Sequence, residues 1–198
     1  MTTVHLQAPF GEEEIRRLRV GDVVSFDGTL FGIRDLTQIH IFDRGHEPPV
    51  ELDGYPCIHT APSLRRTDSG WEPVSVGTTT STRMERFSPL LIERYGVRAI
   101  IGKAGLLSGS LAAMKRFGAV YLAIVGGAAA WETERIKAVT NVYWEHLHPE
   151  ALYEFSVERF GPLIVAMDSH GASLYEQVRH EATERLPEIY RSIGAPEK

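Results

Sequence analysis

Apolar residues form continuous runs in the C-terminal half of this chain, and amphipathic patterns separate the runs. The runs are typical of strands buried on both faces, and they cover residues 97–102, 119–127 and 161–168. Helical spacing predicts helices over residues 82–96, 108–118 and 172–186. Strands and helices in alternation predict a mixed α/β fold, which we expect to form a single domain over residues 1–198.

The N-terminal half has shorter apolar runs and more turn residues. Residues 23–33 place two apolar runs on either side of Asp27-Gly28, a dipeptide that commonly forms the turn of a β-hairpin. We therefore expect a hairpin at this point. The elements expected after it are a short helix over residues 34–45 and strands within residues 55–62 and 71–76.

Charge and cysteine content narrow the class of function. Charged residues make up 24% of the chain and the net charge is −5, so the basic patch typical of nucleic-acid binding is not expected. No apolar run approaches the roughly 18 residues that cross a bilayer, and the first residues do not resemble a signal peptide. We therefore expect a cytoplasmic protein. Cys57 is the single cysteine, so this chain cannot form an intrachain disulfide or supply an all-cysteine cluster site alone.

Small and polar residues gather where predicted strands run into predicted helices. These junctions are residues 77–83, 102–110, 126–130 and 168–171. A helix N-terminus presents free N–H groups that attract anions, and ligands of open α/β sheets gather at the carboxyl ends of the strands. Arg83 and Lys103 lie in two of the junctions, so the pattern favours a small anionic ligand such as a carboxylate.

Each of these features also has a purely structural explanation. A Ser/Thr cluster before a helix commonly caps it, and an arginine on the first helical turn is commonly a solvated charge. The glycines near Lys103 do not match a phosphate-binding loop, because Ala104 stands where such a loop has Ser or Thr. His146 and His148 lack a third ligand in the sequence, so we predict no metal site in this chain.

Five stretches occur in an order known from one enzyme family. They are RDLTQ (34–38), GTTTSTRM (77–84), IGKAG (101–105), GGAAA (126–130) and residues 150–175. Over nearly its whole length the chain resembles the β subunit, or C-terminal domain, of class I fumarate hydratases and L(+)-tartrate dehydratases. The resemblance implies an α/β fold of the swivelling β/β/α type found in that family.

The resemblance also implies a reaction, a cofactor and a partner. Members of the family are hydro-lyases that reversibly add or remove water across a small dicarboxylate. A separate α subunit or domain holds a [4Fe–4S] cluster through three cysteines, and the fourth iron acts on the substrate hydroxyl as a Lewis acid. The single cysteine of this chain agrees with that division. The implied partner is therefore a cluster-bearing α subunit, in an α2β2 heterotetramer that is active only when assembled.

By the same resemblance, Thr79 and Lys103 are the expected catalytic residues. Thr79 matches the base that removes a proton from the carbon next to a carboxylate. A threonine hydroxyl is too weak for this role unless nearby positive charge favours its alkoxide, and Lys103 and Arg83 carry such charge. The expected substrate-binding residues are Arg34, Arg83, Thr80 and Gln38.

Two positions depart from the family pattern and leave the substrate open. Gln38 stands where the family commonly has histidine, and Thr78 stands where it commonly has proline. Glutamine cannot titrate near neutral pH as histidine does. We predict fumarate and malate as the substrate pair, with L(+)-tartrate or a mesaconate-type substrate as the alternatives.

Two alternatives belong to other classes of protein. A non-catalytic interaction or regulatory module with the same fold is disfavoured because Arg34, Thr79, Arg83 and Lys103 are retained together. A stand-alone acid–base lyase without a cluster is disfavoured because the chain has no convincing His/Glu/Asp constellation.

Overall fold

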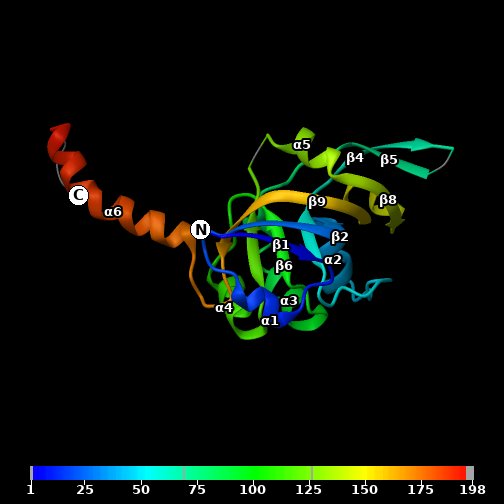
Figure 1. The fold of residues 1–198 in the computed structure, drawn as a ribbon, viewed down its shortest axis with the longest axis horizontal. Helices are drawn as coiled ribbons and strands as arrows, with labels where there is room; N and C mark the ends of the chain where they lie inside the picture. Colours follow the sequence, from blue (N-terminus) through cyan, green and yellow to red (C-terminus); the bar gives the residue numbers. More distant parts are fainter. Residues whose placement is uncertain (1, 69, 126, 195–198) are drawn as a thin grey trace.

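The computed structural model of this chain describes residues 2–68, 70–125 and 127–194, whose strands form one nine-stranded mixed sheet (Figure 1). The strands are β1 (Thr3–Gln7), β2 (Val23–Ile33), β3 (Pro56–His59), β4 (Ser63–Thr67), β5 (Gly70–Ser75), β6 (Ala99–Gly102), β7 (Val120–Ala123), β8 (Ile136–Tyr143) and β9 (Leu152–Met167). The helices are α1 (Glu12–Arg17), α2 (Asp35–Phe42), α3 (Ser88–Tyr95), α4 (Ser108–Phe117), α5 (Ala129–Glu134) and α6 (Leu174–Ser192), with 3-10 turns η1 (Ser81–Met84) and η2 (Glu145–Glu150). The predicted mixed α/β class is confirmed.

The sheet closes on itself through its two longest strands. Its strand order is β1-β2-β3-β6-β7-β9-β8-β5-β4, and β2 also pairs with β9 in antiparallel fashion. The strands β2, β3, β6, β7 and β9 therefore form a closed circuit, in which ladder hydrogen bonds run from strand to strand without a free edge. Figure 1 shows α1, α3 and α4 on one side of the strands and α5 on the other side.

Successive residues of the central strands point into two different hydrophobic clusters. On β6, Ile101 belongs to the first cluster and Ile100 to the second. On β3, Ile58 and Cys57 divide in the same way. The second cluster also takes in apolar side chains of α3 and α4, among them Leu91. Side chains alternate across a strand, so burial on both faces explains why the predicted strands appear as continuous apolar runs.

The expected hairpin over residues 23–33 is wrong, because β2 runs through Asp27 and Gly28 without reversing. Gly28 has a φ of 111°, and the register between β2 and β9 shifts between Phe26 and Gly28. A Cβ atom at Gly28 would lie 2.9 Å from the carbonyl oxygen of Ala8. Gly28 therefore lies at a β-bulge, where the backbone of Ala8 approaches closely. The Asp-Gly pair here serves inside a strand and not as the turn of a hairpin.

The helix expected over residues 82–96 is divided into η1 and α3. Proline stands in the first turn of α3, as Pro89. Proline has no amide hydrogen and restricts the residue before it, so it begins a helix more readily than it continues one. Gly96 ends α3 in the left-handed conformation, as predicted, with a φ of 63°. Because of the break, Arg83 lies on η1 and not on α3.

The terminal helix expected over residues 172–186 is confirmed as α6, which projects away from the sheet (Figure 1). Its N-cap is Ser173, whose hydroxyl accepts a hydrogen bond from the amide of Glu176 at 3.4 Å. The helix contains no buried residue. None of the helices in residues 2–68, 70–125 and 127–194 is long and apolar enough to cross a membrane.

Candidate active site

Three parallel strands end side by side at one edge of the sheet. The strands β2, β3 and β6 are parallel neighbours, and ligands of α/β sheets commonly bind at such carboxyl ends. Arg34 directly follows β2, and Lys103 directly follows β6. The threonine run reaches the same edge, because Thr78 pairs with Thr60 just after β3, and Thr80 pairs with Lys103.

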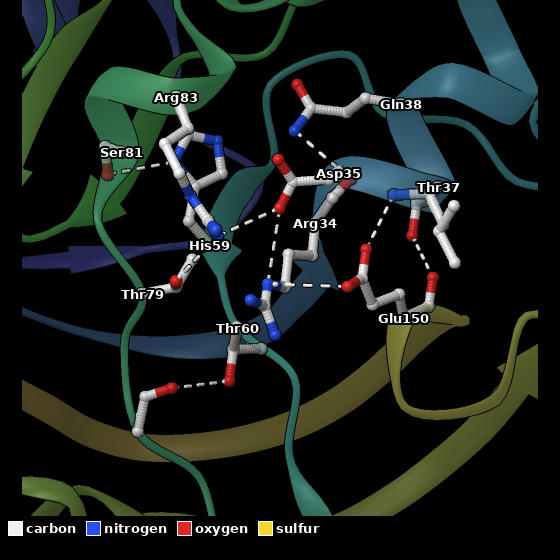
Figure 2. Close-up of polar contacts among 12 residues, drawn as sticks. Arg34, Asp35, Thr37, Gln38, His59, Thr60, Thr79, Ser81, Arg83 and Glu150 are labelled. Atoms are coloured by element: carbon white, nitrogen blue, oxygen red, sulfur yellow. Dashed lines mark hydrogen bonds and ion pairs between the residues drawn. The ribbon is translucent and has the colours of Figure 1, made fainter.

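Asp35 joins the two arginines that were expected to bind substrate (Figure 2). Its Oδ2 atom accepts a hydrogen bond from Arg83 Nη2 at 3.0 Å and lies 3.3 Å from Arg34 Nε. The same Arg83 Nη2 donates to Thr79 Oγ1 at 3.1 Å. The structure thus brings Arg34, Thr79 and Arg83 together from two segments that are distant in the sequence.

Glu150, at the end of η2, holds the first turn of α2. Its Oε2 atom accepts a hydrogen bond from the amide of Leu36 at 2.7 Å, and its carbonyl oxygen accepts one from the hydroxyl of Thr37. Its Oε1 atom lies 3.7 Å from Arg34 Nε. Despite these neighbours, Arg34 Nε makes no well-aligned hydrogen bond with the described residues. Because Arg34 Nε is buried, a ligand carboxylate would be bound through the Nη atoms of this guanidinium.

Lys103 adds positive charge at the same edge of the sheet. Its side chain is partly buried, and its backbone amide donates to the carbonyl oxygen of Thr79 at 3.5 Å. Within the described part of the chain, no carboxylate oxygen lies within ion-pair distance of its ammonium group. This edge therefore sets two arginines and Lys103 against two carboxylates, and the net positive charge favours an anionic ligand.

Gln38 lies one turn after Arg34 on α2, and its side chain is fully buried. Its Nε2 atom donates to the carbonyl oxygen of Arg34 at 3.3 Å. Its Oε1 atom has no hydrogen-bond partner among the residues that the structure describes. Gln38 thus supports the start of α2 in this structure, and its direct contact with substrate stays a prediction.

The N-terminus of α4 is filled by a carboxylate of the chain itself. Glu85 accepts hydrogen bonds from the amide of Leu107 at 2.7 Å and from the amide of Ser110 at 2.9 Å. A carboxylate at this position satisfies the free amides and the helix dipole. The expectation that residues 102–110 present a free helix N-terminus to a ligand is therefore wrong. In the junction at residues 126–130, Gly126 lies outside the described residues.

The sequence-based site omitted Asp35 and Glu150, which hold the arginines and the start of α2. Asp35 directly follows Arg34 in the RDLTQ stretch. Its position next to an expected substrate-binding residue could have indicated that it belongs to the site. Glu150 has no such local signal, because it reaches α2 from the turn before β9. A contact of that kind depends on how the chain folds back on itself.

The described residues of this chain do not fit an iron–sulfur cluster. No group of three His, Cys, Asp or Glu side chains among them is arranged to hold a metal ion. Cys57 is fully buried, and burial raises the pKa of its thiol to about 12. The thiolate that binds iron is therefore strongly disfavoured. Any cluster that works with this chain needs ligands from elsewhere.

His59 lies beneath the threonine run and is fully buried. Its Nδ1 atom lies 2.9 Å from Ser81 Oγ, and its carbonyl oxygen accepts a hydrogen bond from the amide of Thr79 at 2.9 Å. Burial lowers the pKa of its imidazole to about 3. The ring is therefore neutral throughout the neutral and mildly acidic range.

This depressed pKa predicts that His59 weakens the folded chain as the pH falls from about 6.5 towards about 3. Over that range the unfolded state binds a proton that the native state does not. The free energy of unfolding therefore falls by up to about 1.4 kcal/mol per pH unit. Denaturant unfolding of the wild type and of His59→Gln at several pH values measures this. The advantage of the wild type should shrink at lower pH, and a difference independent of pH would contradict a neutral buried histidine.

The fold and the site together define a class of protein: an α/β domain with a cationic cluster at the carboxyl edge of its parallel strands. Comparison with known families agrees with this description. The family model described as "Fumarase C-terminus" matches residues 1–178. This chain therefore belongs to the fumarase C-terminus family, as the sequence resemblance predicted.

Individual relatives carry two kinds of name. A "Putative fumarate hydratase class I" from Geobacillus stearothermophilus is 38% identical over 192 residues, which are 96% of this chain but 37% of that protein. A "Putative L(+)-tartrate dehydratase subunit beta" from Methanocaldococcus jannaschii is 37% identical over 90% of this chain and 94% of its own length. The "L(+)-tartrate dehydratase subunit beta" of Escherichia coli (strain K12) is 34% identical over 95% of this chain and 94% of its own length.

Proposed function

We propose that this chain is the β subunit of a hydro-lyase that reversibly adds water across a small dicarboxylate, with fumarate and malate as the substrate pair. The observation that carries the proposal is the hydrogen bond from Arg83 Nη2 to Thr79 Oγ1 at 3.1 Å. A guanidinium at this distance stabilises the threonine oxygen as it loses its proton. The names of the relatives support the same class of reaction.

In this proposal Thr79 removes the proton from the carbon next to a substrate carboxylate. The side chain of Arg83 is 48% exposed, and guanidinium donors beyond those used by Asp35 and Thr79 face the ligand. As the carbon loses its proton, the carboxylate takes on enediolate charge, which Arg83 and Lys103 neutralise. Arg34 binds a further carboxylate oxygen with its free donors and so fixes the substrate's orientation.

We assign the other half of the site to an α subunit that holds the [4Fe–4S] cluster. The side chain of Arg83 is 48% exposed in this chain, and charge stabilisation of the kind described needs a second surface that excludes water. Swivelling of this domain on its partner would open and close the site. An α2β2 assembly is the stoichiometry that we propose.

L(+)-tartrate is the second candidate substrate, and one observation favours it. Two of the three relatives described above are named L(+)-tartrate dehydratase subunit beta, one of them as putative, and one is named a putative fumarate hydratase class I. The substrate test is direct. The assembled protein is supplied with fumarate, malate, L(+)-tartrate or mesaconate, and the kcat/KM values are compared. A larger kcat/KM for L(+)-tartrate than for fumarate and malate would replace the first proposal with the second.

Arg83→Ala and Lys103→Ala are each expected to weaken use of the dicarboxylate by the assembled enzyme. A lost charged hydrogen bond in a closed site costs about 1.5–3 kcal/mol, or roughly 10- to 100-fold in kcat/KM. Arg86→Ala is the matched control, because Arg86 pairs with Asp43 at 2.6 Å, away from the site. Steady-state kinetics measure the effect. A kcat/KM equal to that of the control, in either variant, would remove that residue from the proposed mechanism.

A further inference from the structure

Ser81 lies between Thr79 and Arg83 in the sequence and anchors their segment to the protein interior. The side chain of Thr79 is partly exposed and that of Arg83 is exposed, whereas Ser81 is fully buried. The amide of Ser81 donates to the carbonyl oxygen of Lys103 at 2.9 Å, and the amide of Thr79 donates to that of His59 at the same distance. The two proposed reactive side chains therefore flank a buried anchor on the same short segment (Figure 2).

Two buried side chains converge on the hydroxyl of that anchor. His59 Nδ1 lies 2.9 Å from Ser81 Oγ, and the Tyr121 hydroxyl donates to the same Oγ at 3.0 Å. All three residues are fully buried. Gly102 closes the space around them, because a Cβ atom there would lie 1.9 Å from Ser81 Oγ and 3.0 Å from the Tyr121 hydroxyl. The cluster therefore ties the segment to β3 and β7, and the absence of a side chain at Gly102 of β6 leaves room for it.

One of these two hydrogen bonds has a fixed direction. The Tyr121 hydroxyl donates to Ser81 Oγ, whereas the donor between Ser81 Oγ and His59 Nδ1 depends on the tautomer of the histidine. Burial lowers the pKa of His59 to about 3 and raises the pKa of Tyr121 far above its usual value. At neutral pH the imidazole of His59 and the phenol of Tyr121 are therefore both uncharged.

We propose that Tyr121, Ser81 and His59 are positioning residues that hold Thr79 and Arg83 in reactive geometry. This inference rests on the function proposed above. Without the Ser81 hydroxyl, two buried polar groups lose their partner, and the segment is free to shift. The hydrogen bond between Arg83 and Thr79 lies within that segment, so a small shift alters the group proposed to activate the base. Misplacement on the order of 1 Å is expected to cost up to about 100-fold in rate.

The kinetic test uses Ser81→Ala and Tyr121→Phe in the chain assembled with its α subunit. Both variants should lower kcat by roughly 10- to 100-fold while KM stays near the wild-type value. Tyr175→Phe is the matched control, because its ring neighbours that of Tyr121 at 6.3 Å and it makes no hydrogen bond to Ser81. Wild-type kcat in both folded variants would overturn the inference. A lower melting temperature with unchanged kcat would show a purely structural role and overturn it equally.

A second measurement separates this inference from the proposed function. Hydrogen exchange at the amides of Thr79 and Ser81 needs no substrate and uses the full chain. Exchange should be faster in Ser81→Ala and Tyr121→Phe than in Tyr175→Phe, because the anchor is lost in the first two. Equal exchange in all three would overturn the inference even if the enzyme is active. If the wild-type assembly shows no hydro-lyase activity while exchange differs, the proposed function fails and the anchoring stands.

Discussion

Thr79→Val in the assembled enzyme is expected to lower kcat by about 10²–10⁴, the contribution typical of a positioned acid–base group. Valine keeps the branched shape of threonine but has no oxygen that can take up the substrate's proton as an alkoxide. Substrate Kd should change little, because Arg34, Arg83 and Lys103 still bind the carboxylates. The loss should therefore appear in kcat and leave binding nearly intact, which separates a base from a binding residue.

The structure bears on the competing explanation that the threonines merely cap a helix. Thr80 occupies the N-cap position of η1, and its side chain makes no capping hydrogen bond. The hydroxyl of Thr79 instead accepts a hydrogen bond from Arg83. A capping role would predict a loss of about 1 kcal/mol of stability with little kinetic change. The geometry favours a kinetic effect.

The deciding measurement is exchange of the substrate's C3 hydrogen with solvent deuterium. Thr79→Val should abolish this exchange, since proton removal is the step assigned to Thr79. Thr78→Val is the matched control, because it makes the same threonine-to-valine change at the neighbouring position and leaves the hydroxyl of Thr79 in place. Exchange at the wild-type rate in Thr79→Val would mean that another group is the base.

The second large effect is a complete loss of activity when the chain is isolated. After anaerobic treatment with iron and sulfide, the isolated chain should show no [4Fe–4S] absorption and no turnover of fumarate or malate. Its single cysteine is Cys57, which is fully buried and whose thiol has a pKa raised to about 12. A cluster needs several accessible thiolates, which this chain does not provide.

Addition of the α subunit should restore both the absorption and the turnover. Cys57→Ala is the control in the assembled protein, and its iron content should equal that of the wild type. A stable cluster with turnover in the isolated chain would overturn the division of labour between subunits. If the α subunit alone were as active as the assembly, this chain would be a non-catalytic module, which is the alternative from another class.

The local sequence was sufficient for those features that depend on neighbouring residues. The apolar runs that became β6 and β7 were recognisable because both faces of these strands are buried, so no polar position interrupts them. Gly96 marked the end of α3, because a left-handed residue is needed there. The identities of Arg34, Thr79, Arg83 and Lys103 also came from short contiguous motifs.

Contacts between distant segments could not be obtained in this way. The Asp27-Gly28 pair suggests a hairpin, yet the long β9 pairs with β2 and keeps it extended through that point. Glu85 is an ordinary acidic residue in the sequence, and it becomes the cap of α4 because the end of η1 lies against the start of that helix. Local propensity is weak compared with burial and pairing, so the tertiary arrangement overrides it.

The site itself shows the same division. The sequence proposed the cations from their positions at strand ends and Thr79 from the family resemblance, and their roles in the reaction stay predictions. The orientation of those groups depends on Asp35 between the two arginines, on Glu150 beside α2 and on the buried Ser81. Each of these contacts joins segments far apart in the chain. Hydrophobic periodicity reports which face of an element is buried, but the partner on that face is set by how the whole chain packs.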